Sequence, residues 1–156
     1  MDNIRIYLAG PLFTVAEREF NRKLGSYLKK EFPSIIIDLP QEYSASIYGQ
    51  PNSLDLVFEN CLQSIKKSDL IIAVLDGPDV DSGTCIEIGY AYAYKKPILG
   101  IRTDFRESEY KGVNLMVSKS CNDIIRSKNI TCDFKDISYQ LGSAIRDLLL
   151  TISSRS

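Results

Sequence analysis

The segment from residue 70 to residue 91 constrains the fold more than any other part of the chain. It begins with six apolar residues, turns through a glycine, a proline and three aspartates, and continues as a second, mostly apolar stretch. A strand, a loop and a helix in this order place the loop at the carboxyl end of the strand, where open α/β sheets bind ligands. The segment therefore predicts a sheet and the location of a candidate site.

Glu87 is the only charged residue between Asp81 and Lys95. A helix that is apolar nearly all round is expected to be buried, and an ionised carboxylate in such a helix is costly unless it has partners or a function. Glu87 is therefore either a structural residue held near the helix start by the dipole or a cap, or a functional group.

The rest of the chain alternates between strand and helix patterns. Apolar or β-branched runs predict strands at residues 4–9, 34–38, 69–75, 97–101 and 123–126. Helical periodicity predicts helices that begin after Thr14, at Ser53, at Thr84, near 113 and at Asp136 or Ser138, with loops at 39–52 and 102–113. Alternation of this kind predicts an α/β fold with a mainly parallel sheet of about five strands and helices on both faces.

Two helices carry apolar stripes that we expect to face the core. The stripe of the helix at 53–67 consists of Leu54, Val57, Cys61 and Ile65. The stripe of the last helix consists of Ile137, Leu141, Ile145, Leu148 and Ile152.

Composition excludes several classes of function. The 156 residues predict one domain over 1–156. The net charge of −1, without runs of like charge, argues against nucleic acid as a partner. No apolar run approaches the about 18 residues of a membrane span, and the polar N-terminus does not resemble a signal peptide. We therefore expect a cytoplasmic protein without a membrane partner.

The cysteine and histidine content bears on metals and catalysis. Four cysteines lie far apart without a CxxC motif, and there is no histidine, so no metal site is expected. The cysteines are typical of reduced, mostly buried thiols. Acid–base chemistry near pH 7 must then come from carboxylates, tyrosine, cysteine or lysine.

Polar clusters follow the predicted strands at 7–13, 41–43, 76–87 and 102–114, and they should meet at one edge of the sheet. Such a site suits a flat heterocycle and a polyol. Glu87 could attack a sugar carbon as a carboxylate nucleophile, Tyr7 could orient it, and Asp81 could bind a sugar hydroxyl or share a proton with a leaving base. The structural alternatives are a core tyrosine, an Asx-turn or cap aspartate, and a helix-capping Asn114.

A phosphate site is the competing interpretation of the loop before Glu87. Ser82, Gly83 and Thr84 offer hydroxyls and amides at a helix N-terminus, which suits an anion. However, the chain has no GxxxxGK[ST] or GxGxxG motif, and the carboxylates of Asp79 and Asp81 would repel phosphate. A neutral sugar is the better match.

Four patches together carry a resemblance to a known family. They are IYLAGPLF at 6–13, LPQE at 39–42, DSGTCIEIGYA at 81–91 and GVNLM at 112–116. In this order they resemble the nucleoside 2-deoxyribosyltransferase family. The resemblance implies a flavodoxin-like, doubly wound α/β fold and a homo-oligomer with sites between subunits. It implies transfer of the deoxyribosyl group of a 2′-deoxynucleoside to a free nucleobase through a covalent sugar ester, without a cofactor.

The resemblance also implies roles for individual residues. Glu87 matches the nucleophile, Tyr7 the tyrosine that positions it, and Asp81 an acidic residue that contacts the substrate. Asn114 matches an asparagine lent to the 5′-hydroxyl in a neighbouring subunit's site. The remaining candidates for substrate binding come from the same patches: Gly10, Phe13, Gln41, Ser82 and Gly83.

One position departs from the family pattern. Many members carry an aspartate eight residues before the aspartate that starts the third strand, and here Cys61 occupies that position, preceded by Asn60. Asn60 could take over contact with the leaving base after a slight shift, or Cys61 could be a core residue. The proton donor to the base stays open.

Two other functions fit the same fold. A hydrolase would use the same nucleophile and pass the sugar to water. Relatives that take 5′-monophosphates tend to carry serine where this chain has Asp81, so the sequence favours an unphosphorylated substrate. A non-catalytic nucleotide-sensing module would bind without turnover.

Overall fold

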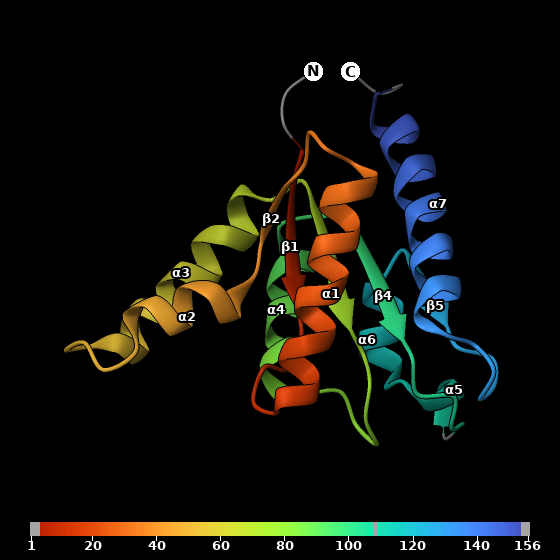
Figure 1. Ribbon diagram of the computed structural model, residues 1–156, viewed down its shortest axis with the longest axis horizontal. Helices are drawn as coiled ribbons and strands as arrows, with labels where there is room; N and C mark the ends of the chain where they lie inside the picture. Colours follow the sequence, from red (N-terminus) through yellow and green to blue (C-terminus); the bar gives the residue numbers. More distant parts are fainter. Residues whose placement is uncertain (1–3, 108, 154–156) are drawn as a thin grey trace.

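Five strands form one parallel sheet in the computed structural model, which describes residues 4–107 and 109–153 (Figure 1). The order across the sheet is β2-β1-β3-β4-β5, and every neighbouring pair is parallel. This is the flavodoxin-like doubly wound order, which confirms the predicted fold class. The strands are β1 (Arg5–Ala9), β2 (Ile36–Asp38), β3 (Leu70–Val74), β4 (Ile98–Arg102) and β5 (Asp123–Arg126).

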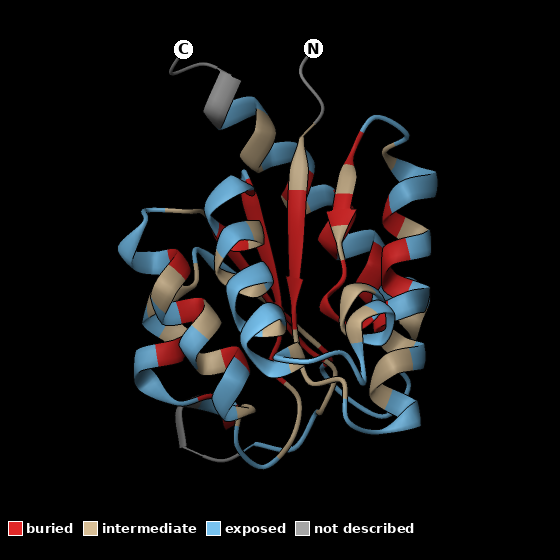
Figure 2. Cartoon of the chain, turned by 90° about the vertical axis from the view of Figure 1, so that its left-hand side faces the viewer, coloured by how far each residue is buried: buried red, intermediate tan, exposed pale blue. Residues whose placement is uncertain are grey.

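Helices cover both faces of the sheet. Successive strand residues point to opposite faces, so Ile6 and Leu8 join one core cluster and Tyr7 and Ala9 join the other. The first cluster lies under α1 (Val15–Glu31) and α7 (Phe134–Ser153). The second lies under α3 (Ser53–Lys67), α4 (Ser82–Ala93) and α6 (Leu115–Ser120). Figure 2 shows the strands as the buried layer between helices with exposed outer faces.

Two predicted loops contain helices. The segment after β2 forms α2 (Pro40–Ile47), and the segment after β4 contains α5 (Glu109–Gly112). Pro40 is at the start of α2, where its fixed φ favours a helix and its missing N–H costs nothing. The prediction of a loop at 39–52 was wrong for residues 40–47, because the polar composition of the segment, with its Gly49 and Pro51, is typical of a loop.

The helix caps confirm one prediction and correct another. Thr14 and Glu17 form the predicted capping box of α1. The last helix begins earlier than predicted, at Phe134, because the Asp133 carboxylate accepts from the backbone N–H groups of Lys135 and Asp136 at 2.8 and 3.0 Å. Asp133 therefore does the capping that was assigned to Asp136 or Ser138.

Two helices are less buried than their sequences predict. Leu54 was expected to face the core and is 84% exposed, because the first turns of α3 project beyond the sheet beside α2 (Figure 1). In α4 only one stripe is buried, and Ile86 and Tyr92 are 65% and 60% exposed. The four cysteines are free and half-buried, which corrects the expectation of mostly buried thiols.

In the last helix, the expected inward stripe holds for Ile137, Leu141 and Ile145. Leu148 is only partly buried, and the side chain of Ile152 lies outside the described residues. No helix in the described part of the chain is long and apolar enough to cross a membrane.

Candidate active site

Tyr7 and Glu87 meet at the core of the candidate site. Tyr7 lies in β1 and is fully buried, and its side chain points to the face of the sheet that α4 covers. Its hydroxyl donates a hydrogen bond of 2.5 Å to Oε1 of Glu87, one turn into α4. Because residue 7 and residue 87 are far apart in the chain, only the packing of α4 on the sheet creates this contact.

The surroundings change the acidity of both groups. The pKa of Glu87 is raised to about 7. Burial is the largest cause and the charge of Asp81 adds to it, while hydrogen bonding by Tyr7 and Cys61 opposes the rise. Burial, and then the charge of Glu87, also raise the pKa of Tyr7. Tyr7 therefore stays protonated and donates, while Glu87 exchanges its proton near neutral pH. Such a shift is typical of functional carboxylates.

Tyr43 and Cys61 extend this cluster. The Tyr43 hydroxyl, from α2, donates to Sγ of Cys61 in α3 at 3.1 Å. The charges of both groups raise the pKa of Tyr7, and hydrogen bonding by Cys61 lowers the pKa of Glu87. Cys61 is thus part of the site's surroundings rather than plain core.

Tyr43 was not among the sequence candidates. It lies two residues after Gln41, and this spacing puts their side chains on nearly opposite sides of a helix. Pro40, at the start of α2, was the signal that could have predicted this helix. In a helix, Gln41 and Tyr43 contact different neighbours.

Asp81 caps the helix that carries Glu87. Its Oδ2 accepts from the backbone N–H of Thr84 at 2.9 Å and from the Thr84 hydroxyl at 3.1 Å. This confirms the capping interpretation, and both bonds use the same carboxylate oxygen, Oδ2. Ser82 and Gly83 are exposed in the first turn of α4.

Gln41 is directed into the packing between α1 and α2. It is nearly buried, its amide donates to the carbonyl of Arg18 at 3.0 Å, and its oxygen accepts from Asn21 at 3.3 Å. These bonds fix its orientation. Phe13, by contrast, is 74% exposed in the loop after β1.

Gly10 lies against the neighbouring strand. A Cβ at this position would lie 3.1 Å from Cβ of Val74. This is tighter than ordinary packing, so the glycine lets the loop after β1 cross close to β3.

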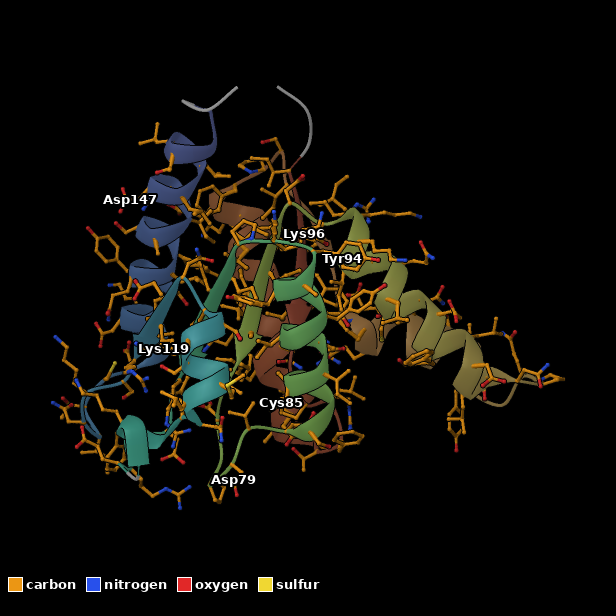
Figure 3. All side chains as sticks on the ribbon, turned by 180° about the vertical axis from the view of Figure 1, so that it is seen from behind. Asp79, Cys85, Tyr94, Lys96, Lys119 and Asp147 are labelled. Carbon is orange, nitrogen blue, oxygen red and sulfur yellow. The ribbon has the colours of Figure 1, made fainter. Side chains whose placement is uncertain are left out.

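Asn114 lies on a different side of α4 from Glu87. It caps α6, accepting from the Met116 N–H at 2.9 Å, and it lines a pocket of about 410 Å³ together with Cys85 and Gly89. Residues 85 and 89 are one turn apart on α4, and Glu87 lies roughly half a turn away from both. Figure 3 shows Cys85 between α4 and α6. Within one chain, Asn114 therefore faces the side of α4 that carries Cys85 and Gly89, and not the side that carries Glu87.

Asn60 is exposed on α3, beside Cys61 in the sequence. No group of three or more potential metal-binding side chains occurs among the described residues. The site therefore consists of a carboxylate, two tyrosines, a thiol and the start of α4.

Comparison with known proteins identifies the family. The family model for nucleoside 2-deoxyribosyltransferase matches residues 6–116. The chain belongs to the nucleoside 2-deoxyribosyltransferase family. The family is named for transfer of the 2-deoxyribosyl group of nucleosides. The Tyr7–Glu87 pair and the start of α4 both lie within the matched region.

The chain is also similar to three individual proteins. An uncharacterised protein of Ureaplasma parvum is 33% identical over 137 residues, 80% of this chain and 84% of that protein. The structure of the 2-deoxyribosyltransferase from Bacillus psychrosaccharolyticus has a TM-score of 0.66 at 25% identity, covering 85% of this chain and 95% of that one. The structure of the CMP N-glycosidase of Clostridium botulinum has a TM-score of 0.60 at 24% identity, covering 88% and 97%.

Proposed function

We propose that this protein, as one domain over residues 1–156, transfers the 2-deoxyribosyl group between nucleobases. The observation that carries the proposal is the 2.5 Å hydrogen bond from the buried Tyr7 hydroxyl to the half-buried Glu87 carboxylate. One oxygen of Glu87 is fixed, so the other can be aimed at a substrate carbon. A carboxylate held in this way is suited to nucleophilic attack on C1′ of a sugar.

The reaction has two steps. In the first, an oxygen of Glu87 bonds to C1′ while the C1′–N bond breaks, and the base leaves with a proton from Asp81, a neighbouring group or water. In the second, a nitrogen of another base bonds to C1′, the ester bond breaks, and the incoming base loses a proton. Two inversions at C1′ restore the original anomer. Ping-pong kinetics are the expected signature.

Chromatography of a 2′-deoxynucleoside with and without a second free base tests the proposal. We expect a new deoxynucleoside that requires both the second base and Glu87. Glu59→Gln, which changes an exposed carboxylate on α3, is the matched control and should keep the activity. Release of free base at the same rate without an acceptor would instead identify a hydrolase, and binding without turnover would favour the sensing module.

The pH dependence follows from the pKa of Glu87, which is raised to about 7. The nucleophile must be ionised, so kcat/KM should fall by about tenfold for each pH unit below about 7. Initial rates measured from pH 5 to 9 with one deoxynucleoside check this. A rate that stays constant down to pH 5 would contradict the assignment of Glu87 as the nucleophile.

We also propose that the active protein is a homo-oligomer in which Asn114 completes a neighbouring site. Asn114 lies away from Glu87 within the chain, and Ile86, Tyr92 and Met116 leave an exposed apolar surface on α4 and α6. Exposed apolar surface of this kind is typical of an interface.

Mixing two inactive variants tests the shared site. In the proposed dimer, each site takes Glu87 from one chain and Asn114 from the other. When a Glu87→Ala chain pairs with an Asn114→Ala chain, one of the two sites therefore has both residues intact. After refolding together, about a quarter of wild-type activity should return, because half of the dimers are mixed. The absence of any recovery would place Asn114 and Glu87 in the same chain's site or remove Asn114 from it.

A further inference from the structure

A second pocket lies at the carboxyl ends of β4 and β5, and it shares no residue with the Tyr7–Glu87 cluster. It has a volume of about 260 Å³. Its lining carries five basic side chains and two acidic ones, a net excess of three positive charges. The basic residues are Arg102, Arg106, Lys111, Arg126 and Lys128, and the acidic ones are Asp104 and Glu107. The chain as a whole has a net charge of −1, so this concentration is local.

Arg102 is the buried centre of this pocket, with 3% of its surface exposed. Its Nη1 donates to the carbonyls of Leu75 and Gly77 at 2.7 and 3.1 Å, which braces the loop after β3. Its Nη2 makes only a long bond of 3.4 Å to the carbonyl of Arg106, and its Nε has no partner within the described part of the chain. The Nε–Nη2 edge, which binds oxyanions through two parallel bonds, is therefore underused.

Gly112 lies against this edge without a side chain. A Cβ at residue 112 would lie 2.7 Å from both Nε and Nη2 of Arg102. The backbone of Gly112 is also in the left-handed region, with φ +81°. Any other residue would be strained there and would crowd the guanidinium.

Arg126 adds a second guanidinium beside the first. Arg102 and Arg126 are register partners on neighbouring strands, an arrangement in which like charges destabilise each other. Burial, and then the charge of Arg102, lower the pKa of Arg126. Nη1 of Arg126 donates to the carbonyl of Lys111 at 2.8 Å, and the charges of Cys121, Glu107 and Asp123 raise its pKa against the effect of Arg102.

The acidic side chains nearby compensate the charge of this pair only in part. Oδ2 of Asp104 lies 3.7 Å from Nη2 of Arg102, beyond hydrogen-bond distance. The Asp104 carboxylate instead accepts three bonds from the Arg106 side chain, at 2.5 to 3.1 Å, and one from the Arg106 backbone N–H at 3.0 Å. Glu107 is exposed. In the described part of the chain, both guanidiniums therefore donate hydrogen bonds to backbone carbonyls and to no carboxylate.

We propose that the pocket around Arg102 and Arg126 binds a phosphate group, supplied as free phosphate or by a phosphorylated metabolite. This site goes beyond the proposed transferase function and does not depend on it. Because Arg102 also holds the loop that leads to α4, an anion on its free edge would stabilise the loop that precedes Glu87.

Calorimetric titration with inorganic phosphate, at an ionic strength held constant with chloride, tests the site. Loss of one charge-assisted contact in Arg126→Gln should weaken binding at least about tenfold. Lys128→Gln, which changes an exposed residue and should not disturb folding, should weaken it less. Arg22→Gln, at an exposed arginine on α1, is the matched control and should bind as the wild type does.

Glu87→Gln should bind phosphate as the wild type does, which separates this site from the proposed catalytic one. Equal weakening in Arg22→Gln and Arg126→Gln, or no binding beyond that of chloride, would overturn the proposal. The same titration with ribose 5-phosphate and with a 2′-deoxynucleoside 5′-monophosphate identifies the source. Tighter binding of either that is lost in Arg126→Gln supports the site, whereas nucleotide binding that depends on Glu87 and not on Arg126 contradicts it.

Discussion

Glu87→Gln should reduce base exchange by at least about 10⁴-fold, because an amide cannot form the sugar ester that the two-step reaction requires. The replacement has nearly the same shape, and its oxygen can still accept the bond that Tyr7 donates to Oε1. The loss would therefore report on the missing nucleophile rather than on a rearranged site. Initial rates of deoxynucleoside synthesis measure it, beside the Glu59→Gln control.

The same variant should be more stable than the wild type at high pH. Burial raises the pKa of Glu87 from 4.5 to about 7, so the folded state holds a proton that the unfolded state has already released. The stabilising contribution of this group is complete below about pH 4.5 and is lost as the pH rises through 7. Glutamine carries no charge, so Glu87→Gln should gain about 1–3 kcal/mol at pH 8 and lose most of that advantage at pH 5.

Urea unfolding at the two pH values measures this difference. A variant that is both inactive and stabilised at pH 8 would indicate a carboxylate kept for function at a cost in stability. A variant that is destabilised at both pH values would show that Glu87 is a structural residue, and an active variant would end the covalent mechanism.

Tyr7→Phe should lower kcat by about 10²-fold, since it removes one preorganised hydrogen-bond donor from the site. Tyr7 is fully buried and phenylalanine has the same shape, so the sheet should be undisturbed. The hydrogen bond from Tyr7 lowers the pKa of Glu87 against the effect of burial. Its loss should move the acidic limb of the pH–rate profile to higher pH.

The pH–rate profile distinguishes a role of Tyr7 in positioning Glu87 from a role in packing alone. Tyr27→Phe, in α1 on the other face of the sheet, removes a tyrosine hydroxyl that is far from Glu87 and should leave both kcat and the limb unchanged. If Tyr7→Phe lowered kcat without moving the limb, Tyr7 would not act through the acidity of Glu87.

Much of the candidate site could be predicted because its chemistry is concentrated in short segments. Glu87 is the one charge in an apolar helix, and Tyr7 lies in a strand that is followed by a glycine and a proline. The parallel order of the strands then requires both to lie at one edge of the sheet. Tyr43 and Cys61 could not be assigned in this way, because their contact of 3.1 Å depends on how α2 and α3 pack against each other.

Burial was predicted well for strands and poorly for two helices. Strand residues such as Ile72 and Ile98 are buried whichever helices cover them. A helical apolar stripe is buried only where a partner surface exists, and the first turns of α3 extend past the sheet (Figure 1). Leu54 is exposed for this reason. Ile86 and Tyr92 are exposed because they lie on the side of α4 that faces away from the sheet.

Local periodicity and residue type were enough to predict the α/β class, the parallel sheet, and Glu87 and Tyr7 as candidate site residues. The tertiary structure alone decided the acidity of Glu87, the neighbourhood of Tyr43 and Cys61, and the pairing of Arg102 with Arg126. Desolvation and contact between residues far apart in the chain depend on how the elements pack, and no local pattern encodes that packing.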